Sequence, residues 1–397
     1  MTRRPLVLKH LAVPRPGLAV AIIALALAGS FAFAALDGGF GLRSFALVAG
    51  VAFGVALQRG ELSLVRAWRD LMMLRDSGQL LGFLAALAVA ALLTLGTLAG
   101  FGLAPPANAR IGPVDWLLPI AGFVFGVGSV ISRGGVMVHL RRISEGSLVA
   151  APALLAVFAG FVLALTHWRW TFEAAIEHAP TPWLPDALGL AGALAAQLAA
   201  IAVLVAALWR WRPKLPASDA GLMRRVLIEP WPATAAGALL GVLVAASYAA
   251  GEPLGLIAEC ATVARWLATA LGLAPDHLPG LDAGIAGLVV PRIEGFALTH
   301  HVVIIAGFVL GAFACAVGSG RFSLTGVTAR ECVEMLLGGT MLGWGAMTAL
   351  GAVTGEAIAG VAVGAVSGWV FLASTSLGIV VTLKLMGDPS AASQAAA

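Results

Sequence analysis

Charged residues are scarce in this chain: Asp, Glu, Lys and Arg make up 11% of its 397 residues, against about 25% in soluble domains. Cysteine occurs only three times, too few and too scattered for a disulfide framework or a cysteine metal site. These absences exclude an ordinary soluble enzyme, a disordered chain and a secreted disulfide scaffold. The basic residues do not cluster on a polar domain, so the net charge of +4 gives no indication of a nucleic-acid partner.

Hydrophobic residues, by contrast, make up 60% of the chain and occur in long runs. Outer-membrane barrels show short alternating strands instead, so the sequence predicts an all-α polytopic membrane protein. About 9–10 of the runs approach the ~20 residues needed to cross a bilayer. We expect ten apolar segments, at residues 17–35, 44–57, 79–103, 114–130, 147–165, 187–208, 233–249, 300–318, 333–351 and 361–386.

Two further segments differ from simple spans. Residues 58–76 are amphipathic and basic, which predicts a helix at the cytoplasmic edge. Residues 250–275 carry few charges and are expected to form an interfacial or re-entrant helix on the outer side. Short or glycine-broken spans are typical of cavity-lining helices in transporters.

The distribution of Lys and Arg predicts an orientation. If the N-terminus is inside and all ten segments cross, 19 of the 24 Lys and Arg residues lie on the inner side. This bias follows the positive-inside rule, so both termini are predicted to be cytoplasmic.

The element G-x-x-[FL]-G recurs five times, at 50–54, 122–126, 237–241, 307–311 and 339–343. Glycines four apart lie on one face of a helix and permit close packing. A longer match relates GFVFGVGSVISRGG (122–135) to GTMLGWGAMTALGA (339–352), and each copy ends in a break of the apolar pattern. The two copies have opposite predicted directions, which indicates an inverted repeat around re-entrant or half-helices.

The second similarity, between 50–64 and 307–324, involves segments of the same predicted direction, so either the span count is wrong or this pair lies outside the inversion. The expected division is a cytoplasmic N-terminus (1–16), a first membrane repeat (17–208), a cytoplasmic basic linker (209–232), a second membrane repeat (233–386) and a cytoplasmic tail (387–397).

Several motifs, in this order and spacing, resemble the YeeE/YedE-like inner-membrane family associated with sulphur transport. They are FGVALQR (53–59) with Arg69-Asp70, FGVG (125–128), RGG (133–135), EGSL (145–148), SGRF (319–322), LGAVTG (350–355) and SGW (367–369). The resemblance covers nearly the whole chain. It implies a bacterial inner-membrane protein and a permease for a small sulphur-containing anion such as thiosulfate.

The family pattern also implies three pathway cysteines. At the matching positions this chain has Ser63, Gly135 and Ala352. Two alternatives to thiosulfate transport therefore stay open: a permease for a different small solute, and a non-transporting membrane scaffold or subunit. A cytoplasmic sulphur-carrier partner is conceivable but unidentified.

The glycine breaks are the expected substrate path, because half-helix N-termini supply N–H donors and positive potential to an anion. Thr354 is expected to cap the second half-helix or to donate its hydroxyl. Arg133 either attracts an anion or lies at the cytoplasmic face, and Glu356 is either functional or solvated at the outer rim. The predicted path residues are Ser63, Arg133, Gly134, Gly135, Gly351, Ala352, Thr354, Gly355 and Glu356.

No sequence feature predicts catalysis or a cofactor. Walker, Rossmann and HExxH motifs are missing from the sequence, and the polar residues within spans are isolated, so we expect no enzyme. His300-His301 without further ligands is a weak metal signal, and no metal site is expected. The expected partners are the substrate and the lipid bilayer.

Overall fold

The structure is a computed structural model, and almost all of its described residues with regular structure are helical. It describes residues 7–10 (backbone only), 13–213, 221, 224–225, 228–254, 257–273, 277–291 and 298–387. Arg3, Arg4, most of the expected tail (388–397) and parts of the expected linker lie outside them. The elements are β1 (Val7–His10), α1 (Pro16–Leu36), α2 (Leu42–Gly60), α3 (Leu64–Arg69), η1 (Asp70–Leu74), α4 (Gly78–Phe101), α5 (Leu117–Ile131), α6 (Val136–Ser144), α7 (Ala150–Thr166), α8 (Trp168–Thr171), η2 (Phe172–Ile176), α9 (Leu184–Leu208), η3 (Trp209–Trp211), α11 (Ala233–Ala249), α12 (Ile257–Ala270), α13 (His300–Gly318), β2 (Ser323–Thr325), α14 (Ala329–Thr348), η4 (Val353–Ile358), α15 (Ala359–Val363) and α16 (Val366–Met386).

The helices confirm a multi-pass membrane protein. By length and composition, eight helices within the described ranges can cross a bilayer, and the bent pair formed by α7 with α8 and η2 makes a ninth. Helix α11 is apolar but shorter. Helices cover most of each of the ten apolar segments, with two corrections. The segment 361–386 is interrupted between α15 and α16, where Gly364 adopts a φ of +89°. Helix α9, which covers the segment 187–208, is kinked at Gly189, a non-helical residue with a φ of +68°. Segments 58–76 and 250–275 contain the shorter helices α3–η1 and α12.

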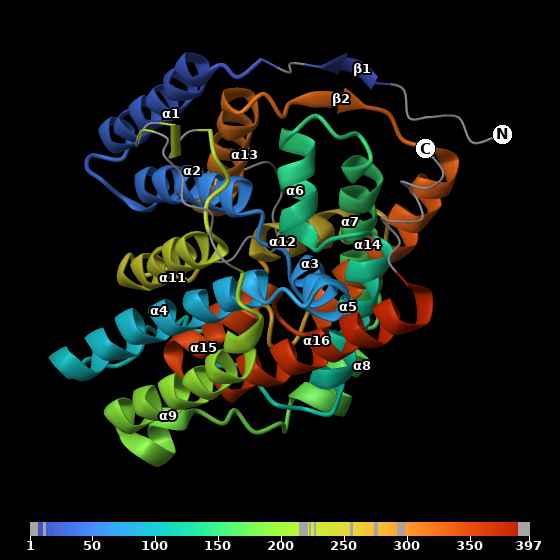
Figure 1. The fold of residues 1–397 in the computed structure, drawn as a ribbon. Coiled ribbons are helices and arrows are strands. Elements are labelled where there is room, and N and C mark those ends of the chain that lie inside the picture. Colours follow the sequence, from blue (N-terminus) through green and yellow to red (C-terminus); the bar gives the residue numbers. More distant parts are fainter. Residues whose placement is uncertain are drawn as a thin grey trace.

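The helices follow a recurring order of long helix, break, short helix and long helix. Unit 1 comprises α2, α3–η1 and α4, and unit 2 comprises α5, α6 and α7. Unit 3 comprises α11, α12 and α13, and unit 4 comprises α14, η4–α15 and α16. Helices α1 and α9 lie outside these units and are the most exposed of the long helices (Figure 1).

The four most extensively packed helix pairs each join two units: α2 with α13, α4 with α11, α5 with α16, and α7 with α14. Figure 1 shows the first two pairs side by side. Glycine lies at each crossing. A Cβ on Gly307 would lie 2.7 Å from the Leu47 carbonyl oxygen, and a Cβ on Gly241 would lie 2.6 Å from the Ala86 carbonyl oxygen. The recurring G-x-x-[FL]-G elements are therefore points of close helix packing.

The contacts also give the directions of the helices. Along α2 and α13, Gly50 meets Ile304 and Gly54 meets Phe308, so this pair is parallel. The first helices of units 2 and 4 are antiparallel, because Gly128 meets Gly338 whereas Gly345 meets Ala121. Units 2 and 4 thus run in opposite directions, as the longer glycine match predicted. The segments 50–64 and 307–324 begin in α2 and α13, which run parallel, so this similarity lies outside the inversion.

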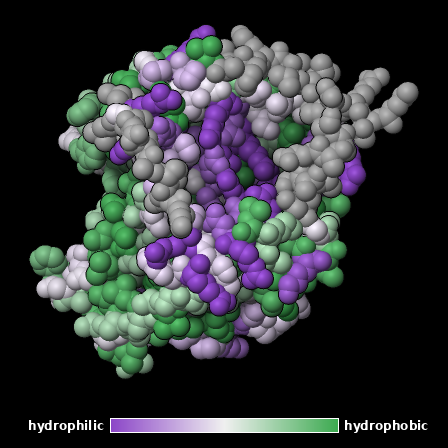
Figure 2. Space-filling model, in the orientation of Figure 1, coloured by the Kyte–Doolittle hydropathy of each residue, from purple (hydrophilic) through white to green (hydrophobic). Residues whose placement is uncertain are grey.

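Hydrophilic side chains gather over the middle of one face, between more hydrophobic margins (Figure 2). The short helices α3 and α6 lie in this part of the view (Figure 1). Strands β1 and β2 pair antiparallel at the edge of the molecule and are a small departure from an all-helical fold. The fold therefore places the short helices α3 and α6, with their interrupted backbone, at the hydrophilic part of a largely apolar bundle.

Candidate functional site

Three of the breaks share one backbone geometry. A residue in the left-handed region follows the long helix: Glu61, Arg133 and Leu350 have φ values of 50°, 61° and 58°. Two positions later, an extended residue forms the N-cap of the short helix. These N-caps are Ser63, Gly135 and Ala352, the three positions at which the resemblance implied cysteine.

The local sequence explains each break. Ser63 caps α3, because its Oγ accepts a hydrogen bond from the Arg66 N–H at 3.4 Å. Gly135 and Ala352 cap α6 and η4 without a side-chain hydrogen bond. Thr354 lies inside η4, so the expectation that it caps this helix is wrong. The first N–H groups of each short helix have no acceptor within their own helix.

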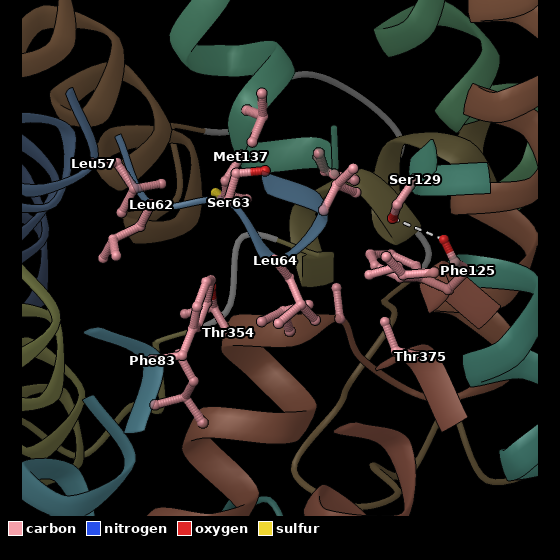
Figure 3. A pocket seen from close by; sticks show the side chains of 18 of the residues that line it. Leu57, Leu62, Ser63, Leu64, Phe83, Phe125, Ser129, Met137, Thr354 and Thr375 are labelled. Carbon is pink, nitrogen blue, oxygen red and sulfur yellow. Dashed lines mark hydrogen bonds between the residues drawn. The ribbon is translucent and has the colours of Figure 1, made fainter. Parts of the chain in front are cut away.

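The three N-caps line one pocket, which we call the chamber (Figure 3). The chamber has a volume of about 740 Å³ including its mouth. Its walls are largely apolar, with Leu57, Phe83 and Phe125 among them. Thr354 and Gly355 also line it, so five of the nine predicted path residues meet in one space: Ser63, Gly135, Ala352, Thr354 and Gly355.

Four hydroxyl groups line the otherwise apolar chamber, on Ser63, Ser129, Thr354 and Thr375 (Figure 3). Ser129 Oγ donates to the Phe125 carbonyl at 2.8 Å. The Thr375 hydroxyl is buried and has no hydrogen-bond partner among the described residues. An unpaired buried hydroxyl costs about 1–3 kcal/mol, so Thr375 would gain from a polar ligand in the chamber.

A second pocket, which we call the vestibule, adjoins the chamber at Ser63, Val65 and Val138, because these residues line both. Its volume is about 700 Å³. Five arginines line it: Arg66, Arg69, Arg133, Arg141 and Arg142. Glu61 is the one acidic residue among its described lining.

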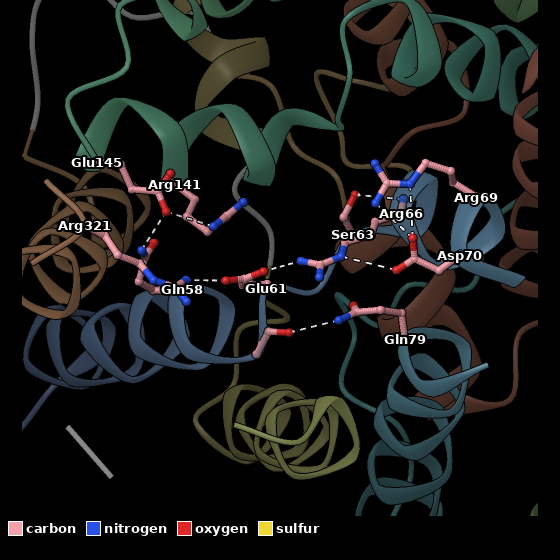
Figure 4. A network of polar contacts seen from close by, with 11 residues as sticks. Gln58, Glu61, Ser63, Arg66, Arg69, Asp70, Gln79, Arg141, Glu145 and Arg321 are labelled. Atoms are coloured by element: carbon pink, nitrogen blue, oxygen red, sulfur yellow. Dashed lines mark hydrogen bonds and ion pairs between the residues drawn. The ribbon is translucent and has the colours of Figure 1, made fainter. Parts of the chain in front are cut away.

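Ion pairs hold four of these arginines in place, and Figure 4 shows the pairs of Arg66, Arg69 and Arg141. Glu61 pairs with both Arg66 and Arg321, so it joins the break of unit 1 to the loop after α13. Asp70 accepts from Arg66 at 3.3 Å and from Arg69 at 2.9 Å. Apart from Glu61, these acids lie outside the vestibule lining, so the wall itself presents mostly guanidinium groups.

Arg133 lies in the vestibule and is not simply solvated at the protein surface. It pairs with Glu331 at 3.2 Å and with Glu334 at 2.6 Å, and its side chain is 15% exposed. Its carbonyl accepts from Arg142 Nη2 at 2.9 Å. Glu331 also completes a capping box with Thr328 at the start of α14, so Arg133 connects the break of unit 2 to unit 4.

Glu356 lies away from the chamber. It is 1% exposed, so the alternative of a solvated carboxylate at the outer rim is wrong. A Cβ on Gly112 would lie 3.2 Å from its Oε1 and 3.0 Å from the Ser367 hydroxyl. The positive charge of Arg110, in the loop before α5, acts on the Glu356 carboxyl, although the two side chains form no salt bridge among the described residues.

Arg110 is buried at 3% exposure and ties several segments together. Its Nη1 donates to the carbonyls of Ala286 and Leu350, both at 3.5 Å. Burial lowers the pKa of Arg110, while Tyr248 and Glu356 raise it. Because Leu350 begins the break of unit 4, Arg110 supports the backbone from which Ala352 reaches the chamber.

The remaining predicted residues, Gly134 and Gly351, do not line the chamber and pack within the breaks. The Gly134 N–H donates to the Ser129 carbonyl at 2.7 Å, and a Cβ on Gly134 would lie 2.6 Å from Val138 Cγ1. A Cβ on Gly351 would lie 2.8 Å from Glu356 Cβ. The sequence interpretation missed Ser129, Thr375 and Arg110. The sequence contains these hydroxyls and this arginine beside apolar spans, but no sequence pattern indicates that they lie near the breaks.

Interrupted helices around an internal chamber, joined to a charged vestibule within a multi-pass bundle, define the class of membrane transporters. The family model described as sulphur transport matches residues 59–381. The chain therefore belongs to the sulphur transport family.

Curated relatives agree with this assignment. The chain is 22% identical to the thiosulfate transporter TsuA of Escherichia coli strain K12 over 349 residues, which cover 84% of this chain and 91% of the relative. It is 26% identical to the thiosulfate transporter TsuA of Spirochaeta thermophila over 336 residues, which cover 81% and 92%.

Proposed function

We propose that this protein moves a small sulphur-containing anion, of the thiosulfate class, through the chamber and the vestibule. The observation that carries the proposal is the convergence of Ser63, Gly135 and Ala352, the N-caps of three short helices from units 1, 2 and 4, on one chamber. The similarity to two thiosulfate transporters supports the substrate class.

The physical basis is the field at the breaks. Each short helix directs the positive end of its dipole and its free N–H groups toward its N-cap. An anion in the chamber would accept hydrogen bonds from these groups and from the hydroxyls of Ser63, Thr354 and Thr375. The apolar walls keep water scarce, which strengthens each of these interactions. The vestibule arginines would attract the anion by their long-range field.

We propose that the vestibule faces the cytoplasm, because the positive-inside bias assigns the loops that carry its arginines to the inner side. Uptake would then carry the anion through the chamber to the vestibule, in a bacterial inner membrane. The two membrane repeats, at 17–208 and 233–386, would form the opposed halves of this path. Glu356 and Gly134 would act as structural supports of the breaks and would not contact the substrate.

The missing thiols favour a second candidate, a scaffold or subunit that keeps the fold without transport. No cysteine lines the chamber or the vestibule among the described residues. Loss of three thiols at once removes the soft ligands that the family resemblance implied. A permease for another small solute is compatible with the same geometry.

Uptake of radiolabelled thiosulfate into proteoliposomes tests the main proposal. We expect saturable uptake, with competition from sulphite or sulphate revealing the preferred anion. Folded protein that carries none of these anions would contradict the proposal.

The triple variant Ser63→Cys, Gly135→Cys, Ala352→Cys separates the candidate functions. A gain of thiosulfate uptake would indicate that the protein lost thiosulfate transport together with these thiols. Unchanged, saturable uptake of another anion would indicate that the protein prefers that anion. Cys332→Ser, at a cysteine that is not part of the chamber lining, serves as the thiol control.

A further inference from the structure

A cavity distinct from the chamber, with about 1250 Å³ of empty space including open solvent at its mouth, brings together residues that are distant in the sequence. We call it the histidine cavity, because His300 and His301 line it together with Asn108, Arg110 and Glu252. Arg110 lies between the two cavities: it lines the histidine cavity and donates to the carbonyl of Leu350, two residues before Ala352 in the chamber wall.

Three side chains in this cavity offer metal ligands. The ligand atoms of Glu252, His300 and His301 all lie within 4.8 Å of one another. Metal–ligand bonds of about 2.0–2.2 Å place the donor atoms of a tetrahedral site roughly 3.5 Å apart, so small side-chain rotations would close the three ligands around one ion. The two histidine rings lie with their centroids 4.0 Å apart, and His300 Nε2 is buried with no hydrogen-bond partner in the described part of the chain.

Surrounding hydrogen bonds hold the ligands in position. Asn108 Nδ2 donates to Glu252 Oε2 at 2.9 Å and to the Gly251 carbonyl at 2.8 Å, which fixes both the carboxylate and its turn. Thr299 caps α13 and donates to Glu259 Oε2 at 2.8 Å, which fixes the first turn that carries both histidines. Oriented ligands of this kind are characteristic of metal sites, where outer partners set affinity.

We propose that Glu252, His300 and His301 bind one divalent metal ion of the zinc class. Two imidazoles and one carboxylate suit Zn²⁺, Co²⁺ or Cu²⁺, whereas Mg²⁺ and Ca²⁺ prefer sites made of oxygen ligands. Three protein ligands leave a coordination position open toward the cavity. The positive charge of Arg110 and the N-terminus of α13 favour an anion or a hydroxide in that position.

Titration of the full chain in detergent, freed of any affinity tag, with Co²⁺ alone tests the site. We expect one Co²⁺ ion per chain, visible as ligand-field absorption bands, and displacement of these bands by Zn²⁺. Glu252→Gln and His301→Asn should each weaken Co²⁺ binding at least tenfold. Glu177→Gln and His178→Asn, which change an exposed carboxylate and an exposed histidine, are the matched controls and should bind as the unmodified protein does.

A gain-of-signal variant guards against loss of binding through misfolding. His300→Cys should bind Co²⁺ with a new thiolate-to-metal charge-transfer band, which requires residue 300 to be a ligand. The proposal is overturned if the unmodified chain binds no Co²⁺, if the Glu252 and His301 variants bind as tightly as the controls, or if His300→Cys binds Co²⁺ without the thiolate band. Because binding is measured without substrate, this result is independent of whether the protein carries thiosulfate.

Discussion

Arg133 and Leu350 adopt the same uncommon backbone conformation, with φ values of 61° and 58°, at matching positions of units that run in opposite directions. Each residue lies two positions after the last residue of a long helix, and two positions later Gly135 or Ala352 is the N-cap of a short one. A left-handed conformation costs a non-glycine residue about 1–2 kcal/mol. Tertiary contacts compensate for this cost: Arg133 pairs with Glu331 and Glu334, and the Leu350 carbonyl accepts from Arg110.

The two adjacent glycines of the first break should respond differently to a methyl group. A Cβ on Gly134 would lie 2.6 Å from Val138 Cγ1, and a buried valine is too stiff to move away easily. Gly134→Ala should therefore destabilise the protein by about 1–3 kcal/mol. At Gly135, the nearest atom to a Cβ is Phe125 Cζ at 3.9 Å, and the backbone is extended.

Gly135→Ala should thus leave stability within about 0.5 kcal/mol. Thermal unfolding in detergent, followed by a fluorescent dye or by tryptophan emission, measures both variants. Equal losses of melting temperature in the two variants would contradict the geometry of this break. The result also bears on the triple cysteine variant described above, because it predicts that residue 135 can carry a side chain without loss of the fold.

The crossing of α2 and α13 gives a second prediction. Gly307→Ala would place a methyl group 2.7 Å from the Leu47 carbonyl oxygen and 3.2 Å from Gly50 Cα, so the helices must separate. We expect a loss of about 1–3 kcal/mol. Gly100→Ala is the matched control, since a Cβ there meets nothing within 4 Å. It should be neutral or stabilising by about 0.5–1 kcal/mol in a helix. A Gly307 variant as stable as the Gly100 variant would show that this close packing is unimportant.

The sequence predicted much of this fold, for identifiable reasons. Apolar runs determine where helices form, and helices cover most of each of the ten expected segments. The breaks at Gly134-Gly135 and at Gly351 were visible because glycine interrupts the apolar pattern. The interruption at Gly364 was missed, since its neighbours are all apolar and only the positive φ of one glycine separates α15 from α16.

The site was predicted less completely. The matching glycines indicated the breaks around Gly134 and Gly351, and the family resemblance singled out Ser63, Gly135 and Ala352. Thr375 and Arg110 could not be assigned, because their positions depend on how α16 packs on α5 and how the loop before α5 reaches Leu350. Glu252 was likewise invisible as a partner of His300 and His301, since only the folded chain brings the turn after α11 to the start of α13.

Arg110 and Glu356 should be energetically coupled. Arg110→Met would remove the positive charge that acts on the buried Glu356 carboxyl, and groups that interact in this way typically couple by about 0.5–3 kcal/mol. Glu356→Gln removes the charge with little change of shape, so the double variant should be more stable than Arg110→Met alone. Chemical or thermal unfolding of the four proteins in this cycle gives the coupling energy. Strictly additive losses would show that the two groups do not interact.

Neutralising one vestibule arginine should weaken uptake without abolishing it. Arg142 donates to the Arg133 carbonyl, and no salt bridge of its own is found among the described residues, so its charge is available to an anion in the vestibule. Loss of one charge at roughly 4–8 Å in a partly hydrated space changes the energy of the anion by about 1–2 kcal/mol. Arg142→Gln should therefore raise the KM for thiosulfate or its preferred substitute roughly five- to thirtyfold.

The charge, and not the shape, should account for this effect. Arg142→Lys is expected to retain most of the apparent affinity for the anion. Raising the salt concentration should raise the KM of the unmodified protein more than that of Arg142→Gln. Arg169→Gln, at an exposed arginine that pairs with Glu173 and is not part of the vestibule lining, is the control and should leave KM unchanged. If Arg142→Gln and Arg169→Gln take up the anion with the same KM and the same salt dependence, the vestibule does not act as an electrostatic funnel, and the anion must reach the chamber by another route.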